Sequence, residues 1–278
     1  MRKSKLITLK KLAIQARKDC METQITVGSG HLGGSFSALE MMIYLYFEEM
    51  NIDPKKPWKN DRDIFILSKG HASLGYYCVL AQRGYIPKEE LKTYRKVNSR
   101  LQGHTHADVL PGVECSTGSL GQGLSFALGM ALGYKRKDMS NRVFVIVGDG
   151  EMQEGQNWEA LMMQGRLKLD NLIPIIDYNR LQLDDCIDEV LGAFKLKQKL
   201  EAFDQNVIEI DGHDFEDIKR AFDNIKVGRA NIILANTVKG KGISFMENSV
   251  PWHAQKLTQE EYKGALEELE KMEVTLND

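Results

Sequence analysis

Residues 143–179 have the sequence VFVIVGDGEMQEGQNWEALMMQGRLKLDNLIPIIDYN, and this stretch decides the fold class. Residues 143–147 form a continuous apolar and mostly β-branched run, which is typical of a parallel strand covered on both faces. Residues 151–168 have a helical composition, with acidic side chains in the first turn, where the helix dipole favours them. Residues 172–176 form a second apolar run. The stretch therefore predicts a strand–helix–strand unit with parallel strands.

A polar turn follows each of these two strands. Gly148, Asp149 and Gly150 follow the first strand, and Asn179 comes about 30 residues after Asp149. In a parallel unit both turns lie at the carboxyl ends of the strands, which is the side of such a sheet where ligands bind. We therefore expect Asp149 and Asn179 to face each other across one ligand.

The residue types in these turns indicate the kind of ligand. Glycine lets the backbone approach a ligand closely, and a helix N-terminus attracts an anion such as a phosphate. A dinucleotide fingerprint would need a third glycine where Gln153 stands, so that site is not predicted. Asp149 would repel a phosphate without a cation between them, and with Asn179 it offers hard oxygen ligands for Mg²⁺ or Ca²⁺. We interpret the pair as a metal–diphosphate site; the alternative is a structural turn at Asp149 and a strand-end cap at Asn179.

The alternation of strands and helices continues along the chain. It predicts an α/β fold in which a parallel sheet is flanked by helices on both faces. Further strands are expected at residues 63–67, 206–210 and 231–235. Helices are expected at residues 9–26, 39–50, 74–82, 88–96, 124–135, 193–203, 215–225 and 258–272.

Three details complete the expected organisation. Ser37 and Glu40 match a capping box for the helix at 39–50. Residues 99–123 lack periodicity, and a loop of that length in a compact chain is usually functional. We treat residues 1–278 as a single domain that ends in an acidic amphipathic helix at 258–272.

The composition excludes several classes of protein. The 278 residues are 42% hydrophobic and 27% charged, with a net charge of −2, which is ordinary for a globular enzyme and gives no basic patch for nucleic acid. The basic N-terminus is not followed by a signal-peptide core, and no apolar run is long enough to cross a membrane. We expect a cytoplasmic protein that binds neither nucleic acid nor membranes. The four cysteines form no C-x-x-C pair, which favours free thiols in a reducing compartment: Cys20, Cys78, Cys115 and Cys186.

The histidines are expected in turns and not on apolar faces. Their spacing matches no H-E-x-x-H type of zinc motif. Several histidines at one edge of a sheet could orient hydroxyl groups and transfer protons. Five are in glycine-rich or polar turns, and His213 follows a predicted strand; the five are His31, His71, His104, His106 and His253.

Taken together, these motifs resemble those of a known family. The string GDGEMQEG, followed by an asparagine about 30 residues after the aspartate, resembles the thiamine diphosphate motif, and its continuation is similar to the transketolase branch of those enzymes. The resemblance covers residues 12–253. Thr105 replaces a usual proline, and His106 is an additional histidine. Other segments match in the family's order: GHLG at 30–33, LSKGH at 67–71, GH and PGVE within 103–114, TGSLGQG at 117–123 and KGKG at 239–242.

The resemblance implies a role for individual residues. The implied metal ligands are the side chains of Asp149 and Asn179 and the backbone carbonyl of Leu181. The residues implied to handle sugar hydroxyls and protons are His31, His104 and His253, although the sequence VPWHA around His253 departs from the commonest pattern. The residues implied to contact the cofactor are His71, Gly118, Leu120, Asp149, Gly150, Glu151, Asn179 and His253.

The implied activity is transfer of a two-carbon ketol unit from a ketose or ketose phosphate to an aldose. The implied cofactors are thiamine diphosphate and Mg²⁺, with Ca²⁺ or Mn²⁺ as substitutes for Mg²⁺. A full transketolase has a second domain that binds the pyrimidine ring of the cofactor. The resemblance therefore implies that this chain is the N-terminal subunit of a split transketolase. A C-terminal subunit with the pyrimidine-binding domain would complete the enzyme, and two such pairs would form a heterotetramer.

Two alternatives stay open at this point. The chain could be a subunit of another thiamine diphosphate enzyme, such as a 2-oxo-acid dehydrogenase component or a deoxyxylulose-phosphate synthase, although LSKGH and PGVECSTGSLGQG favour transketolase. It could also be a non-catalytic binding or regulatory subunit that keeps the fold. The motifs leave open which sugar is used, how Thr105 and His106 shape their loop, and what His213 does.

Overall fold

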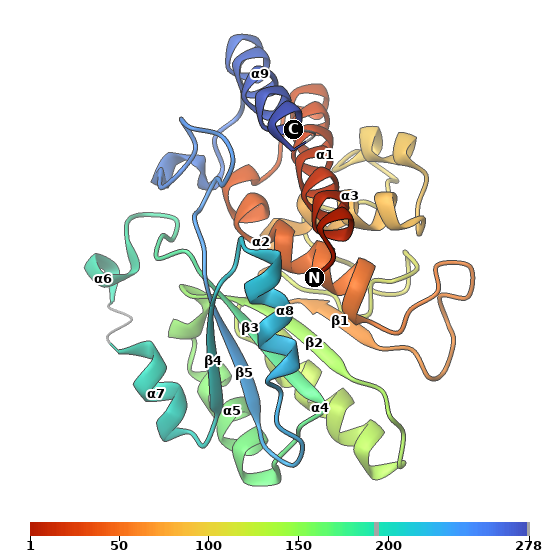
Figure 1. Ribbon diagram of the computed structural model, residues 1–278, viewed down its shortest axis with the longest axis vertical. Helices are drawn as coiled ribbons and strands as arrows, with labels where there is room; N and C mark the ends of the chain where they lie inside the picture. The colour runs from red at the N-terminus through yellow and green to blue at the C-terminus, as the bar shows by residue number, and fades with distance from the viewer. Residues whose placement is uncertain (192–194, 277–278) are drawn as a thin grey trace.

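A parallel sheet of five strands forms the centre of the computed structural model, which describes residues 1–191 and 195–276 (Figure 1). The order across the sheet is β1-β2-β3-β5-β4, and each neighbouring pair is parallel. The predicted parallel α/β fold is therefore confirmed. The strands are β1 (Ile64–Leu67), β2 (Val143–Gly148), β3 (Leu172–Tyr178), β4 (Asn206–Asp211) and β5 (Asn231–Asn236).

Helices cover the sheet and extend beyond it. Within the described part of the chain, none of them combines the length and apolar character needed to cross a bilayer. The α-helices are α1 (Lys3–Val27), α2 (Leu32–Tyr44), α3 (Ser73–Arg83), α4 (Gln122–Arg136), α5 (Gly155–Leu167), α6 (Ile187–Val190), α7 (Leu196–Ala202), α8 (Phe215–Asp223) and α9 (Gln259–Thr275). Shorter segments are a π-helix at Leu45–Glu49 and 3₁₀ turns at Gly70–Ala72, Lys88–Thr93, Glu151–Gln153 and Val250–His253.

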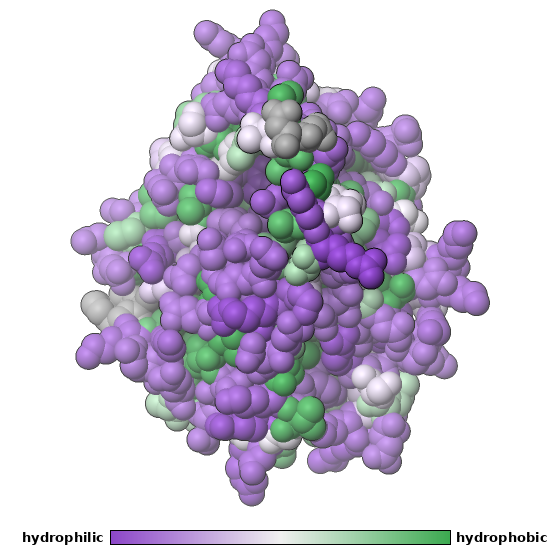
Figure 2. Space-filling model, viewed as in Figure 1, coloured by the Kyte–Doolittle hydropathy of each residue, from purple (hydrophilic) through white to green (hydrophobic). Residues whose placement is uncertain are grey.

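Both faces of the sheet are buried under apolar side chains. Phe144 and Ile146 of β2 belong to a core that includes residues of α1, α2, α3 and α8. Val145, which points to the opposite face, belongs to a second core with residues of α4, α5 and α7. Continuous apolar runs such as β2 are what a strand covered on both sides requires. Figure 1 shows α9 lying along α1, and Figure 2 shows that the surface in the same view is mostly hydrophilic.

Helix α2 begins at Leu32, seven residues before the predicted start at residue 39. The predicted capping box is therefore wrong, because Ser37 and Glu40 are buried inside the helix. Close packing explains why the helix includes two glycines, which are poor helix formers. A Cβ atom on Gly33 would lie 2.5 Å from the carbonyl oxygen of Trp252, so no larger residue fits there.

Other boundaries also differ from the predictions. Glu151 begins a 3₁₀ turn, and α5 starts only at Gly155, because the Glu151 carboxylate turns back to accept hydrogen bonds from the amides of Gly148 and Gly121. Strand β3 extends to Tyr178, past the end of the apolar run at residue 176, so Asp177 lies within the strand. The expected helix at 88–96 is a short 3₁₀ turn. Of the expected helix at 193–203, residues 193–194 lie outside the described residues, and α7 covers most of the rest.

A capping box forms the start of α9, the acidic helix predicted at 258–272. The Thr258 hydroxyl accepts from the Glu261 amide at 3.1 Å, and the Glu261 carboxylate accepts from the Thr258 amide at 2.8 Å. We expect Thr258→Ala to lower the free energy of unfolding by about 1 kcal/mol in urea denaturation, because it removes a helix cap. Thr258→Ser keeps the hydroxyl and should stay within about 0.5 kcal/mol of wild type. An equal loss in both variants would show that the hydroxyl is not responsible.

Candidate active site

A cavity of about 370 Å³ lies where β1, β2 and β3 end at their carboxyl sides. Every residue to which the sequence assigned a metal, cofactor or sugar role lines this cavity. His106 and His213 lie elsewhere. The assigned residues in the lining are His31, His71, His104, Gly118, Leu120, Asp149, Gly150, Glu151, Asn179, Leu181 and His253. Residues that the sequence did not assign include Gly34, Lys69, Gln153, Gln182, Leu183 and Lys239.

Asp149 connects the two turns predicted to face each other. Its carboxylate accepts from the Gly150 amide at 2.7 Å and from the amide of Arg180, next to Asn179. The Asn179 side-chain oxygen accepts from the Leu181 amide at 3.1 Å. The turns after β2 and β3 are thus held together by hydrogen bonds to backbone amides.

The electrostatic environment of Asp149 favours a bound cation. Burial, together with the neighbouring Asp177 carboxylate, raises the pKa of Asp149 to about 7. A divalent cation would stabilise the charged carboxylate against both effects. Among residues 1–191 and 195–276, no group of three or more His, Cys, Asp or Glu side chains could hold a metal by itself. This donor set therefore suits a cation whose remaining ligands come from a bound phosphate.

A buried ion pair, which the sequence did not reveal, lies beside Asp149. Lys69 and Asp177 form it, with side-chain exposures of 2% and 0%. The Asp177 carboxylate also accepts from Ser37 Oγ at 2.6 Å and from the Thr237 hydroxyl. Burial alone would raise the pKa of Asp177, but the Lys69 ammonium lowers it below its usual value. In the sequence, the feature that could have indicated this ion pair is Asp177, a charged residue directly after the apolar run at 172–176.

Three histidine rings meet in the cavity. The ring centroids of His31 and His71 are 5.7 Å apart, those of His31 and His253 are 5.5 Å apart, and those of His71 and His253 are 5.0 Å apart. Burial, reinforced by nearby positive charge, lowers the pKa of His31 to about 4 and that of His253 to about 3. These rings are therefore neutral at pH 7 and can accept a proton or hydrogen-bond a hydroxyl group.

His104 also lines the cavity, where its ring lies against Gly118. Gly118 has φ +126°, and a Cβ atom there would lie 3.0 Å from the His104 ring, so this contact requires glycine. Burial and the charge of Arg95 lower the pKa of His104. The 103–106 and 117–123 segments are thus brought together at the cavity.

Lys239 adds a second ammonium group to the cavity. It donates to the carbonyls of Gln182 at 3.0 Å and Leu181 at 3.3 Å, and lies 3.0 Å from His253 Nδ1. Burial, with the nearby charge of Lys69, lowers the pKa of Lys239 to about 8. Since Asp177 pairs with Lys69, the Lys239 ammonium is the charge that can attract an anionic ligand. In the sequence, the feature that could have indicated this role is the position of Lys239 between the end of a predicted strand and Gly240.

Several polar atoms of the cavity wall lack a partner. His31 Nδ1, Gln153 Nε2 and Gln182 Nε2 are buried without a hydrogen bond from the part of the chain that the structure describes. Buried polar groups are normally satisfied in native proteins. These atoms therefore fit a site that binds a polar ligand.

Comparisons with known proteins agree with this geometry. The family model "Transketolase, thiamine diphosphate binding domain" matches residues 9–271. The chain is 43% identical to one subunit of the apulose-4-phosphate transketolase of Actinobacillus succinogenes, over 86% of this chain and 87% of that protein. It is 42% identical to the 6-deoxy-6-sulfo-D-fructose transketolase subunit SqwG of Clostridium sp. (strain MSTE9), over 95% of this chain and 97% of that protein.

Complete transketolases match over part of their length. The Rattus norvegicus transketolase is 40% identical over 91% of this chain and 40% of that protein. The crystal structure of the Campylobacter jejuni enzyme superposes with a TM-score of 0.86 at 27% identity, over 97% of this chain and 48% of that one. The chain thus spans about half of this solved structure and most of each subunit relative. These matches favour a transketolase subunit over the two alternatives left open by the motifs. The chain belongs to the transketolase family and contains the thiamine diphosphate binding domain of that family.

Proposed function

We propose that this chain is the diphosphate-binding subunit of a two-chain transketolase, which transfers a two-carbon ketol unit from a ketose to an aldose. The observation that carries the proposal is the convergence of all assigned residues in one cavity at the strand ends. The subunit relatives, which align over most of their length, support it. We further propose that residues 1–278 form one domain and that the protein is cytoplasmic, in keeping with its free cysteines.

Asp149, Asn179 and the Leu181 carbonyl would hold Mg²⁺ at the diphosphate of the cofactor, with Ca²⁺ or Mn²⁺ as substitutes. Thiamine diphosphate, when bound, supplies a ring that stabilises the carbanion formed as a carbon–carbon bond breaks. Lys239 hydrogen-bonds the Leu181 carbonyl, so a metal ligated there would replace this contact. Residues proposed to lie against the cofactor are His71, Gly118, Leu120, Gly150, Glu151 and His253, besides the metal ligands.

His31, His104 and His253 would orient sugar hydroxyls and carry protons. Their lowered pKa values keep the rings uncharged near pH 7, which a proton acceptor needs. The Lys239 ammonium faces His253 Nδ1 as a donor, so the ring proton of neutral His253 is placed on Nε2. His253 can then donate to an oxygen through Nε2.

A second chain would cover the open side of the cavity. Leu120 and Leu183 line the cavity with exposures of 37% and 60%, and Leu191 on the following segment is 65% exposed. Exposed apolar side chains beside a polar site are typical of a surface that another protein covers. The proposed partner is a C-terminal subunit with the pyrimidine-binding domain, which also fits the relatives whose names describe them as transketolase subunits.

A separate surface supports the association of two such pairs into a heterotetramer. Phe126 on α4 and Met162 and Met163 on α5 are 54%, 61% and 46% exposed. Gly129 and Gly133 on α4 have open space where a Cβ would stand, so another helix could approach closely. These adjacent helices therefore offer an apolar surface for a second copy.

The names of two relatives suggest the substrate class. One is named for apulose 4-phosphate and another for 6-deoxy-6-sulfo-D-fructose, so we propose a sugar with an anionic end. The test is a turnover assay of the chain mixed with its partner, using a ketose phosphate, a sulfonated ketose or pyruvate as donor. We expect ketol transfer from an anionic ketose. Turnover of pyruvate without transfer from any ketose would contradict the proposal.

A further inference from the structure

Residues 237–242, here called the lysine loop, carry Lys239 from the end of β5 into the cofactor cavity. Backbone contacts on the other side of the loop hold it in place. The Gly240 amide donates to the Gly33 carbonyl at 3.0 Å. The Val238 amide donates to His213 Nε2 at 2.8 Å, and Arg17 Nε donates to the Lys241 carbonyl at 2.6 Å. The neighbours of Lys239 are thus fixed on both sides.

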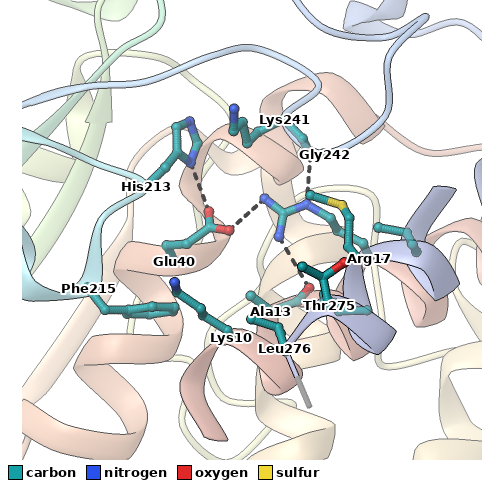
Figure 3. Close-up of a pocket in the computed structure, with 13 residues that line it drawn as sticks. Lys10, Ala13, Arg17, Glu40, His213, Phe215, Lys241, Gly242, Thr275 and Leu276 are labelled. Carbon is teal, nitrogen blue, oxygen red and sulfur yellow. Dashed lines mark hydrogen bonds and ion pairs between the residues drawn. The ribbon is translucent and has the colours of Figure 1, made fainter. Parts of the chain in front are cut away.

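Glu40 joins the two side chains that hold the loop. Its carboxylate lies 3.0 Å from His213 Nδ1 and 2.7 Å from a terminal nitrogen of Arg17, as the dashed lines in Figure 3 show. Arg17 lies on α1, Glu40 on α2, and His213 in the turn between β4 and α8. Arg17 and Glu40 are only 4% and 6% exposed. Burying two charges costs desolvation free energy that their mutual attraction only partly offsets. A buried pair here therefore indicates a role beyond stability.

The hydrogen-bond directions in this group fix one state of the imidazole. His213 Nε2 accepts from a backbone amide, so the ring proton lies on Nδ1 and is donated to Glu40. A carboxylate that orients a histidine in this way sets both its tautomer and its ring position. The Val238 amide has no freedom to move without losing this acceptor.

We propose that His213, Glu40 and Arg17 are positioning residues that hold the lysine loop and so place Lys239 in the cofactor cavity. This inference rests on the proposed function, because that proposal makes the cavity lined by Lys239 the cofactor site. The loop itself has little room to adapt: Gly240 has φ +79°, and a Cβ atom there would lie 2.3 Å from the Met246 carbonyl oxygen. A displacement of Val238 is therefore transmitted to Lys239 and to its contacts with Gln182 and His253.

A second cavity of about 360 Å³ gives access to these positioning residues from solvent. Its walls include apolar side chains of α1, α8 and α9 together with His213, Glu40 and Arg17 (Figure 3). The volume is ample for a small aromatic molecule such as imidazole. Free imidazole can therefore reach the space that His213 would leave on truncation.

The test uses His213→Ala in the full chain, with two readouts. Backbone amide exchange of residues 237–242, measured by hydrogen–deuterium exchange, should become roughly tenfold faster, because the Val238 amide loses its acceptor. Affinity for Mg²⁺–thiamine diphosphate, measured by calorimetry, should fall roughly tenfold. Added imidazole should restore both, and His213→Gln, which keeps a donor and an acceptor, should lose less than His213→Ala.

His106→Ala is the matched control, because His106 is an exposed histidine whose ring hydrogen-bonds the carbonyl of the adjacent Ala107 at 2.7 Å. Neither readout should change in that variant, with or without imidazole. Unchanged exchange at 237–242 in His213→Ala, or faster exchange with unchanged cofactor affinity, would overturn the inference. If His213→Ala unfolds, the same two measurements on His213→Gln test the inference instead. Failure of the wild-type chain to bind the cofactor would instead count against the proposed function, and the exchange data would still decide whether His213 holds the loop.

Discussion

Replacement of Asp149 by alanine is expected to abolish Mg²⁺-dependent binding of thiamine diphosphate while the fold stays intact. Asp149 is the only charged member of the proposed ligand set, and the other two ligands are a neutral amide and a carbonyl. Loss of that charge should weaken cofactor binding by about 100-fold or more. The fold should tolerate the change, because burial raises the pKa of Asp149 to about 7 and the charged form contributes little stability.

Calorimetric titration of thiamine diphosphate, with Mg²⁺ and with a chelator, measures this effect. Asp149→Asn removes the charge and keeps one of the two side-chain oxygens, so it retains an acceptor for either the Gly150 or the Arg180 amide, which bond different oxygens of the carboxylate. We expect Asn to bind nearly as weakly as Ala. Asp184→Ala, at an exposed position in the same connecting segment, should bind as wild type. Unchanged affinity in Asp149→Ala would refute the proposed metal site.

The second large effect is expected on stability. Asp177→Ala removes one half of a fully buried ion pair and leaves the Lys69 ammonium with two neutral hydrogen-bond partners, the Gly34 carbonyl at 2.9 Å and Ser37 Oγ at 3.4 Å. An uncompensated buried charge costs about 3–5 kcal/mol. Urea denaturation should therefore show a loss of that size in the free energy of unfolding.

A double-mutant cycle separates the ion pair from the rest of the site. Lys69→Met combined with Asp177→Leu replaces both charges by apolar groups, so the double variant should be less destabilised than the sum of the two single variants. Additive losses would show that the two charges do not stabilise each other.

For the single variant Asp177→Ala, a loss below about 1 kcal/mol in the free energy of unfolding would also contradict the importance of the pair.

The sequence was sufficient to predict the features that depend on local pattern. The apolar runs at 143–147 and 172–176 identified strands covered on both faces, and the polar turns after them identified the ligand edge of the sheet. Asp149 and Asn179 come together because parallel strands end on the same side. The position of β5 between β3 and β4 was not predictable in this way, because alternation of elements determines strand direction but not strand order.

Contacts between distant segments account for what the sequence did not reveal. Ser37 and Glu40 match a capping box locally, but α2 already starts at Leu32, and both side chains are buried against distant segments. Ser37 donates to Asp177, and Glu40 pairs with Arg17 and His213. Lys69 follows β1 and Asp177 lies in β3, and no local pattern indicates that they pair. The same holds for Glu40 and His213, which are 173 residues apart in sequence.

The central claim is that this chain holds one half of a transketolase site. Turnover of a ketose phosphate by the purified chain, alone and after addition of a purified subunit with the pyrimidine-binding half, tests that claim most directly. We expect no turnover alone and ketol transfer on mixing, which Asp149→Ala should abolish again. Full transketolase turnover by the purified chain alone would contradict the claim.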